Sequence, residues 1–333
     1  MFRILFQGEW MDGMPVHWND SQVFMLLRDG RLREVEPESV KSFTLLTGGY
    51  RGFTPAEMRS QLVGEFGSGY EVTGLGHYLV VHPVGRRDAW APRFEELYRS
   101  FITYFSSRGF QLQEPRYPLV AVVYPHQADF ERQIRRDSFT PPGNILGYYS
   151  PTTNRINMYD VTADKKGYDW TVNADTIIHE ATHQTAFNVG IHHRFGTMPQ
   201  WIVEGLGTMF EARGVWNSKT FSSQTDRINR GKLDAFRKYA RGRRDKNAIA
   251  NLVCYDHLFK NDPEAAYCEA WALTFFLSEA EPQKFQRFVA KTAASKAFTE
   301  YTSPQRLKDF TDIFGTNLGM LDSRMQRFLQ SLK

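Results

Sequence analysis

The chain has few cysteines: among its 333 residues only Cys254 and Cys268 are present, which excludes a disulfide-rich scaffold and a cysteine metal cluster. It also lacks long apolar runs, since no stretch approaches the roughly 18 apolar residues that a membrane-spanning helix needs. Its apolar start is interrupted by Gln7, Gly8 and Glu9 before a signal peptide could form. We therefore expect a cytoplasmic protein with no membrane partner, exported only if a leader has been removed. Any metal ion must be held by histidine and carboxylate side chains.

Charge of one sign is not in strong excess, because 41 Lys and Arg residues stand against 37 Asp and Glu residues, a formal net charge of +4. The densest basic stretch spans residues 227–244 and has aromatic residues interleaved. Such a stretch could bind a polyanion with an affinity that falls steeply as salt rises. However, Asp226, Asp234 and Asp245 dilute its charge. We interpret it as the solvated face of a helix and do not expect a nucleic-acid partner.

The first part of the chain has the pattern of a small β-rich unit. The runs 23–27 and 31–35 flank Asp29-Gly30, a pair that favours a two-residue type I′ turn in which both residues have positive φ angles. A capping box at residues 54–57 then predicts the start of a helix.

Two further strands are predicted at 70–73 and 77–81, and the polar, turn-prone segment 83–92 is typical of a linker. We therefore predict a small β-rich N-terminal domain of unknown role over residues 1–87 and a second domain over residues 88–333.

The second domain begins with mixed signals and ends with helical ones. The β-branched run 119–123 predicts a buried strand, and the turn-rich interval 151–154 predicts a hairpin between 144–149 and 155–159. From residue 173 onward the periodicity is almost entirely helical. Together these patterns indicate an α+β fold.

The most informative motif is His179-Glu180-x-x-His183, which lies on a segment of helical periodicity. Residues four apart lie on one helix face, so the two imidazoles can bind a single ion. Glu180 is rotated by about 100° from His179 and can reach a water on that ion without ligating it. The alternative is an amphipathic helix whose histidines face solvent. We interpret Asp175 as the cap of this helix rather than as a partner of a ligating histidine.

A catalytic zinc ion needs a third protein ligand and an open position. If the motif helix continues to about Asn188, it extends five residues past His183, or about 7.5 Å. Gly190 then stops that helix and Pro199 starts the next one, in which Glu204 lies five residues from the start. An antiparallel return would bring Glu204 level with His183.

Other residues compete with Glu204 as the third ligand. Glu211 lies seven residues later on the same helix face, but it would overshoot the motif by about two turns. His192 and His193 follow the motif, but their spacing does not match the metzincin arrangement H-E-x-x-H-x-x-G-x-x-H. Glu204 is therefore the favoured ligand.

The motif followed by Trp201-x-x-Glu204-Gly205 resembles the gluzincin branch of the zincin metallopeptidases. More narrowly, the chain resembles DUF1570, a bacterial family of unknown function in the peptidase MA-like group, over roughly residues 90–290. The phrases that carry this resemblance are Gly147-Tyr-Tyr-Ser-Pro151, Ile177-Ile-His-Glu-Ala-Thr-His183, Glu204-Gly-Leu-Gly-Thr-Met-Phe210 and Glu269-Ala-Trp-Ala-Leu273. The resemblance implies an α+β zincin fold with a mixed sheet whose edge strand follows the cleft, an active-site helix, a glutamate helix and further C-terminal helices.

The resemblance also implies two further site elements. Similar enzymes pair a strand with the extended substrate, and residues 145–149 or 156–159 could fill that place; the alternative is an ordinary hairpin. They also place a Tyr or His on a later helix to stabilise the oxyanion, and Tyr267 is the candidate. Tyr267 also begins an i, i+4, i+8 apolar stripe with Trp271 and Phe275, which favours a packed core position.

Motif and resemblance together predict a zinc-dependent metallopeptidase acting on a peptide or protein substrate. Zn²⁺ would be held by His179, His183 and Glu204, with Glu180 as the general base. The alternative is a zinc-containing, peptidase-like binding protein without turnover, which holds its partner in the cleft or through the N-terminal domain. Glu180 argues against this alternative, because a structural zinc site does not need a base.

Overall fold

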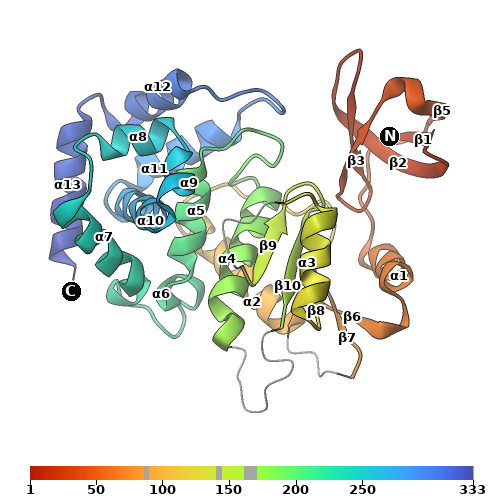
Figure 1. Cartoon of the computed structure of the whole chain (residues 1–333), viewed down its shortest axis with the longest axis horizontal. Coiled ribbons are helices and arrows are strands. Elements are labelled where there is room, and N and C mark those ends of the chain that lie inside the picture. Colours follow the sequence, from red (N-terminus) through yellow and green to blue (C-terminus); the bar gives the residue numbers. More distant parts are fainter. Residues whose placement is uncertain (86–89, 140–144, 161–170, 333) are drawn as a thin grey trace. The chain divides into compact units, whose positions relative to one another are not determined.

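The computed structural model describes residues 1–85, 90–139, 145–160 and 171–332 (Figure 1). The chain divides into two compact units, Met1–Glu96 with Glu114–Glu180 and Leu97–Gln113 with Ala181–Lys333. The divisions cross helices α2 (Ala91–Ser106) and α4 (Thr171–Asn188), so each of these helices contributes to both units. The domain boundary predicted between residues 87 and 88 lies outside the described residues and stays a prediction.

The first unit begins with a five-stranded antiparallel sheet in the order β4-β3-β2-β1-β5. Its strands are β1 (Phe2–Phe6), β2 (Glu9–Trp18), β3 (Val23–Leu27), β4 (Leu32–Val35) and β5 (Val40–Leu45). A small apolar core on this sheet contains Ile4, Phe6, Met25 and Val35. The β-rich start of the chain is thus confirmed.

The predicted hairpin is confirmed as β3 and β4, but its turn is not type I′. Gly30 has a φ angle of 84°, whereas Asp29 does not adopt a positive φ. The Gly30 N–H donates to the Leu27 carbonyl at 2.9 Å, and the Asp29 carboxylate accepts from the Arg31 backbone N–H at 3.0 Å. Because the Asp29 side chain stabilises the loop in this way, one residue with a left-handed conformation is sufficient to reverse the chain between β3 and β4, as in longer hairpin loops.

Helix α1 (Pro55–Phe66) begins with the predicted capping box. The Glu57 backbone N–H donates to Thr54 Oγ1 at 3.3 Å, and the Thr54 backbone N–H donates to Glu57 Oε2 at 2.8 Å. The pair therefore satisfies two backbone donors that a helix start leaves open.

A second, mixed five-stranded sheet follows in the order β6-β7-β8-β10-β9. Its strands are β6 (Tyr70–Leu75), β7 (Tyr78–Pro83), β8 (Leu119–Tyr124), β9 (Gly147–Ser150) and β10 (Arg155–Tyr159). β8 is parallel to both β7 and β10, while β6 and β9 are antiparallel edge strands. β6 and β7, which precede the predicted domain boundary, thus belong to this sheet. The predicted β9–β10 hairpin is confirmed.

Helices α2, α3 (Gln127–Arg136) and α4 pack against this sheet, through aromatic contacts or at a glycine that permits a close approach. Helix α3 packs on β8 and β10, and Phe94 of α2 stacks on Tyr78 of β7 with ring centroids 5.1 Å apart. Gly147 in β9 lies close to α4, because a Cβ atom there would be 3.0 Å from Thr176 Cγ2. Glycine therefore lets the edge strand approach the helix that carries the motif.

The second unit is helical. Besides parts of α2 and α4 it contains α5 (Gln200–Phe210), α6 (Arg213–Trp216), α7 (Arg230–Gly242), α8 (Ala248–Cys254), α9 (His257–Asn261), α10 (Pro263–Ala280), α11 (Pro282–Ala293), α12 (Ser303–Phe314) and α13 (Leu318–Ser331). The central helix is α10, which packs against α5, α7, α9, α11 and α13. Its Trp271 and Phe275 are buried and stacked, as the predicted apolar stripe requires.

Part of the basic stretch is internal in this unit. The Arg244 side chain is only 4% exposed and forms bonds of 2.6 and 2.7 Å to both carboxylate oxygens of Glu269, which is fully buried. Arg244 also pairs with Asp322 at 2.6 Å, and Arg227 pairs with Glu279 at 2.8 Å. The prediction of a solvated face is therefore wrong for Arg244, because the buried carboxylate of Glu269 on α10 and the partly buried one of Asp322 on α13 need a cation.

The two sheets and the helical second unit make an α+β fold, as predicted. Among the described residues, no helix combines the length and apolar character that a membrane crossing requires.

Candidate metal centre

Helix α4 carries the motif residues and ends where the sequence indicates. It runs to Asn188, and Gly190 beyond it has a φ angle of 86°, a conformation that suits glycine at a helix end. His179 and His183 lie one turn apart, and His183 is buried whereas His179 and Glu180 are partly exposed. The helix thus presents two imidazoles together, one of them shielded from solvent.

Helix α5 returns Glu204 to this pair. His183 Nε2 lies 3.6 Å from Glu204 Oε2, and one ligand atom each from His179, His183 and Glu204 all lie within 4.8 Å of one another. Among the described residues, these three are the one group in which three or more potential metal-ligating side chains come together. The predicted approach of Glu204 to His183 is therefore confirmed.

The donor set suits zinc. Two ligands of a tetrahedral zinc ion, each at about 2.0 to 2.1 Å from the metal, lie about 3.4 Å apart. The separation between His183 and Glu204 matches this value, and two nitrogens with one carboxylate oxygen are a common catalytic zinc set. Three ligands leave a fourth position for water or a substrate, which distinguishes such a centre from a closed structural site.

The start of α5 is held by residues far away in the sequence. The Gln200 backbone N–H donates to Asp256 Oδ1 at 2.9 Å, and Arg306 donates to Asp256 Oδ2 at 2.8 Å. A carboxylate at a helix N-terminus satisfies an open donor and interacts favourably with the helix dipole. Asp256 therefore fixes the helix that presents Glu204, a contribution that the sequence analysis did not identify.

Gly205 fixes the other side of α5. A Cβ atom at this position would lie 2.3 Å from Thr274 Oγ1 and 2.6 Å from the Ala270 carbonyl oxygen, both on α10. Only glycine allows α5 and α10 to pack at this distance. Gly205, the residue next to Glu204, thus sets how closely α5 packs against α10.

Glu180 contacts the edge strand rather than the other motif residues. The Tyr149 backbone N–H in β9 donates to Glu180 Oε2 at 2.6 Å. The other carboxylate oxygen, Oε1, has no hydrogen-bond partner in the described part of the chain. Glu180 is therefore oriented by one oxygen and can accept a proton with the other.

The rival ligands do not join the group. Glu211 caps the end of α5 and accepts a hydrogen bond from Asn229 Nδ2 at 2.9 Å. His192 is buried against Phe187, with ring centroids 5.2 Å apart, and burial lowers its pKa to about 3. Burial also lowers the pKa of His193. Neither histidine is in the group of ligand atoms around His183.

Two other predicted residues have different outcomes. Asp175 does not cap α4, because the helix begins four residues earlier, at Thr171, and Asp175 is an exposed residue of its second turn. The Tyr267 ring packs edge-on against Phe259, with centroids 5.5 Å apart, and Lys232 Nζ lies 5.3 Å from its centroid. These contacts place the Tyr267 ring beside α9 and α7, and its catalytic role stays a prediction.

The chain combines an α+β architecture with a His-His-Glu group that could hold a metal ion. Residues 173–299 match the model of DUF1570, described as a protein of unknown function, so the chain contains a DUF1570 domain and the predicted resemblance is confirmed over this span. The matched span includes most of α4, all of α5 and all of α10. No curated protein matches the chain.

Among solved structures, the chain is similar to M1 zinc metallopeptidase structures from Deinococcus radiodurans. The sequence identity is 14% with a TM-score of 0.39 for the metallopeptidase, and 11% with a TM-score of 0.41 for a point mutant of it. The same mutant bound to a Tyr-Ser-Ala substrate gives 11% and 0.40. Each match covers 79% of this chain and 51% of the other, so the chain spans about half the length of these structures.

Proposed function

We propose that this protein is a zinc-dependent metallopeptidase in which Glu180 is the general base. The observation that carries the proposal is the arrangement of His179, His183 and Glu204 around one point, with Glu180 one residue from the first ligand and bonded to a sheet edge. Metal ligands alone are consistent with many metalloproteins. The added base and the edge strand favour peptide hydrolysis.

Each site residue has a separate task in this proposal. His179, His183 and Glu204 hold the ion, and the buried position of His183 limits competition from solvent. When bound, zinc supplies Lewis-acid chemistry that polarises a carbonyl group and makes a water molecule a better nucleophile. Glu180 takes the proton from the attacking water and delivers it to the leaving amine.

The contact with Tyr149 supports the role of Glu180 as the base. A carboxylate held at one oxygen has its other oxygen in a defined direction, which reduces the reorganisation needed at the moment of proton transfer. The Tyr149 N–H at 2.6 Å provides this restraint, and Glu180 Oε1 is the atom that accepts the proton. Both Glu180 and the strand therefore contribute to the geometry of the reaction.

A peptide is the favoured substrate because β9 is an edge strand. In the β9–β10 pair, Tyr148 lies opposite Asn157, and Tyr149 uses its N–H for Glu180 instead of β10. Successive backbone groups point to opposite sides of a strand, so the outer side of β9 can add an extended peptide. Such a peptide would run along β9 and pass beside Glu180, with its carbonyl groups directed across the strand.

The test compares the zinc-loaded wild-type chain with Glu180→Gln. We expect both proteins to contain about one zinc ion per chain by elemental mass spectrometry. In a digest of a peptide library, Glu180→Gln should be slower by about 10²- to 10⁴-fold, the range for loss of a general base. Hydrolysis that persists unchanged in Glu180→Gln would show that Glu180 is not the base.

The ligand assignment has its own matched pair of variants on α5. Glu204→Ala should lose most bound zinc, whereas Glu211→Ala should retain it because Glu211 bonds to Asn229 at the end of the helix. Equal zinc content in both variants would remove Glu204 from the site. Stoichiometric zinc without hydrolysis of any library peptide would instead favour the binding protein without turnover.

A further inference from the structure

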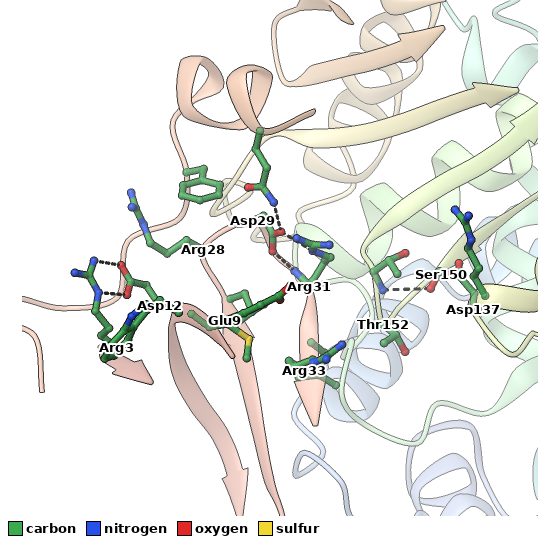
Figure 2. A pocket seen from close by; sticks show the side chains of 18 residues that line it. Arg3, Glu9, Asp12, Arg28, Asp29, Arg31, Arg33, Asp137, Ser150 and Thr152 are labelled. Atoms are coloured by element: carbon green, nitrogen blue, oxygen red, sulfur yellow. Dashed lines mark hydrogen bonds and ion pairs between the residues drawn. The ribbon is translucent and has the colours of Figure 1, made fainter. Parts of the chain in front are cut away.

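A pocket of about 620 Å³ lies in the first unit, and none of the three candidate metal ligands lines it. The N-terminal sheet and α1 contribute to its wall, together with the end of α3 and the β9–β10 turn. Figure 2 shows Arg31 and Arg33 on the strand side and Ser150 and Thr152 on the opposite side. The volume is within the range of about 300 to 1,000 Å³ that is typical of ligand sites.

Arginines are concentrated in this pocket, and most of its acidic residues are already paired. Arg3 binds both oxygens of Asp12 at 2.7 and 2.8 Å, and Arg31 Nε binds Asp29 at 2.5 Å. Asp137, also in the lining, accepts a hydrogen bond from the Tyr148 hydroxyl at 2.7 Å. These carboxylates are therefore engaged by groups of the protein itself.

Two arginines in the lining have no carboxylate partner among the described residues. Arg33 donates only to the side-chain oxygen of Gln7, at 3.0 Å, and Arg136 at the end of α3 is exposed. Arg31 uses its Nε for Asp29, so its two terminal nitrogens also remain available. Against these donors stands Glu9, an exposed acid of the lining that has no ion-pair partner in the described chain. The balance favours an anionic ligand.

The pocket also contains polar atoms that lack partners. Thr153 Oγ1 and Gln61 Oε1 are buried, and neither forms a hydrogen bond within the described part of the protein. A buried polar atom without a partner is costly unless a ligand or a water molecule satisfies it. The Thr153 hydroxyl can donate to a carboxylate, whereas Gln61 Oε1 is an acceptor and suits a water molecule beside the ligand.

Strand β9 connects this pocket to Glu180. Ser150, the last residue of β9, lines the pocket, and the preceding residue, Tyr149, donates to Glu180. One residue of an extended strand spans about 3.4 Å. A peptide that adds to the outer edge of β9 beside Glu180 therefore reaches the pocket within one or two residues.

We propose that this pocket binds acidic side chains of the peptide substrate, with Arg33 and Arg136 as the residues that recognise their carboxylates. An added strand that is antiparallel to β9 has the residues over Ser150 before those beside Tyr149. The acidic residues are then on the N-terminal side of the bond that is cleaved. The acidic preference rests on the proposed peptidase function, but binding itself can be measured without turnover.

The experiment uses zinc-loaded, full-length Glu180→Gln protein, so that the peptide is not consumed. The probe is a fluorescein-labelled peptide with three glutamates before an Ala-Leu-Ala segment, and the reference peptide has glutamines instead. Binding is followed by fluorescence anisotropy. Arg33→Gln and Arg136→Gln should each weaken binding of the acidic peptide by about two- to fivefold, as expected for one charge contact at an exposed site.

Two further variants are matched to these. Arg135→Gln, at an exposed neighbouring position of α3 that does not line the pocket, should leave affinity unchanged. Glu9→Gln removes the opposing charge and should strengthen binding about two- to fivefold. Binding of the glutamate peptide should also weaken as salt rises, while binding of the glutamine peptide should not.

The proposal is overturned if the acidic and neutral peptides bind equally, or if Arg33→Gln and Arg136→Gln behave like Arg135→Gln. Cleavage by the protein with Glu180 intact separates this result from failure of the peptidase function. Cleavage without preference for acidic peptides refutes the pocket alone. Arginine-dependent binding without cleavage refutes the peptidase function and retains the pocket as a site for acidic peptides.

Discussion

Replacing Gly205 by alanine tests whether close packing of α5 on α10 holds the metal site together. The new Cβ atom would lie 2.3 Å from Thr274 Oγ1 and 2.6 Å from the Ala270 carbonyl oxygen, both far inside van der Waals contact. The threonine side chain can rotate, but the carbonyl belongs to the backbone of α10, so the helices must separate. Overpacking of a buried site typically costs about 1 to 3 kcal/mol.

A second helical glycine provides the control. Gly64 lies inside α1 and is exposed, and a Cβ atom added there would have no neighbouring atom within 4 Å. Gly64→Ala should therefore gain about 0.5 to 1 kcal/mol from helix propensity. The same gain applies to Gly205→Ala and is offset by the clash. We therefore expect a net loss of about 1 to 2 kcal/mol at Gly205 and a gain at Gly64, in opposite directions for one chemical change.

The assay is urea unfolding followed by circular dichroism in the presence of a chelator, because bound zinc would add its own stabilisation. Zinc affinity is measured separately by competition with a chromophoric chelator. Since Glu204 is adjacent to Gly205, displacement of α5 should weaken zinc binding in Gly205→Ala and leave it unchanged in Gly64→Ala. Unchanged unfolding and zinc affinity in Gly205→Ala would refute the packing argument.

Two further predictions concern buried groups. Burial raises the pKa of the Cys268 thiol to about 12, so at pH 9 only about one thiol in a thousand is ionised. Iodoacetamide should therefore label Cys268 slowly until urea unfolds the protein. Rapid labelling of Cys268 in the native protein would contradict this prediction. Arg244→Met should lower the free energy of unfolding by about 3 to 5 kcal/mol, because it leaves Glu269 and Asp322 without their cation. The control is Arg243→Gln, which should change this free energy by less than about 1 kcal/mol in thermal unfolding, because the Arg243 side chain is 65% exposed in its pair with Asp262. Similar effects of both variants would refute the buried-pair assignment.

The helix pair of the candidate site was predictable because its signals are local. Helical periodicity, Gly190 and Pro199 define where α4 ends and α5 starts, and simple helix geometry then brings Glu204 to His183. The start of α4 was not predicted, because Thr171, Asn173 and Asp175 are all residue types that commonly cap helices and the sequence does not choose among them. Local residue preferences were thus misleading at the start of α4, where Asp175 does not cap the helix, and informative at its end, where Gly190 follows the last helical residues.

The sheet was predictable strand by strand but not in its pairing. The apolar run of β8 indicates a buried strand, and all six of its residues are buried. Its parallel partner β7 lies on the other side of helix α2 in the sequence, so this pairing depends on contacts between distant segments. The support of α5 by Asp256 was missed for the same reason, since 56 positions separate it from Gln200.

The bond between the Tyr149 N–H and Glu180 has a consequence for how this site can evolve or be redesigned. The donor is a backbone group, so every residue except proline at position 149 can supply it. The side chain has a different partner, since the Tyr149 hydroxyl donates to Asn154 in the β9–β10 turn at 2.7 Å. Position 149 can therefore be varied in a library while the restraint on Glu180 is inherited by nearly every member.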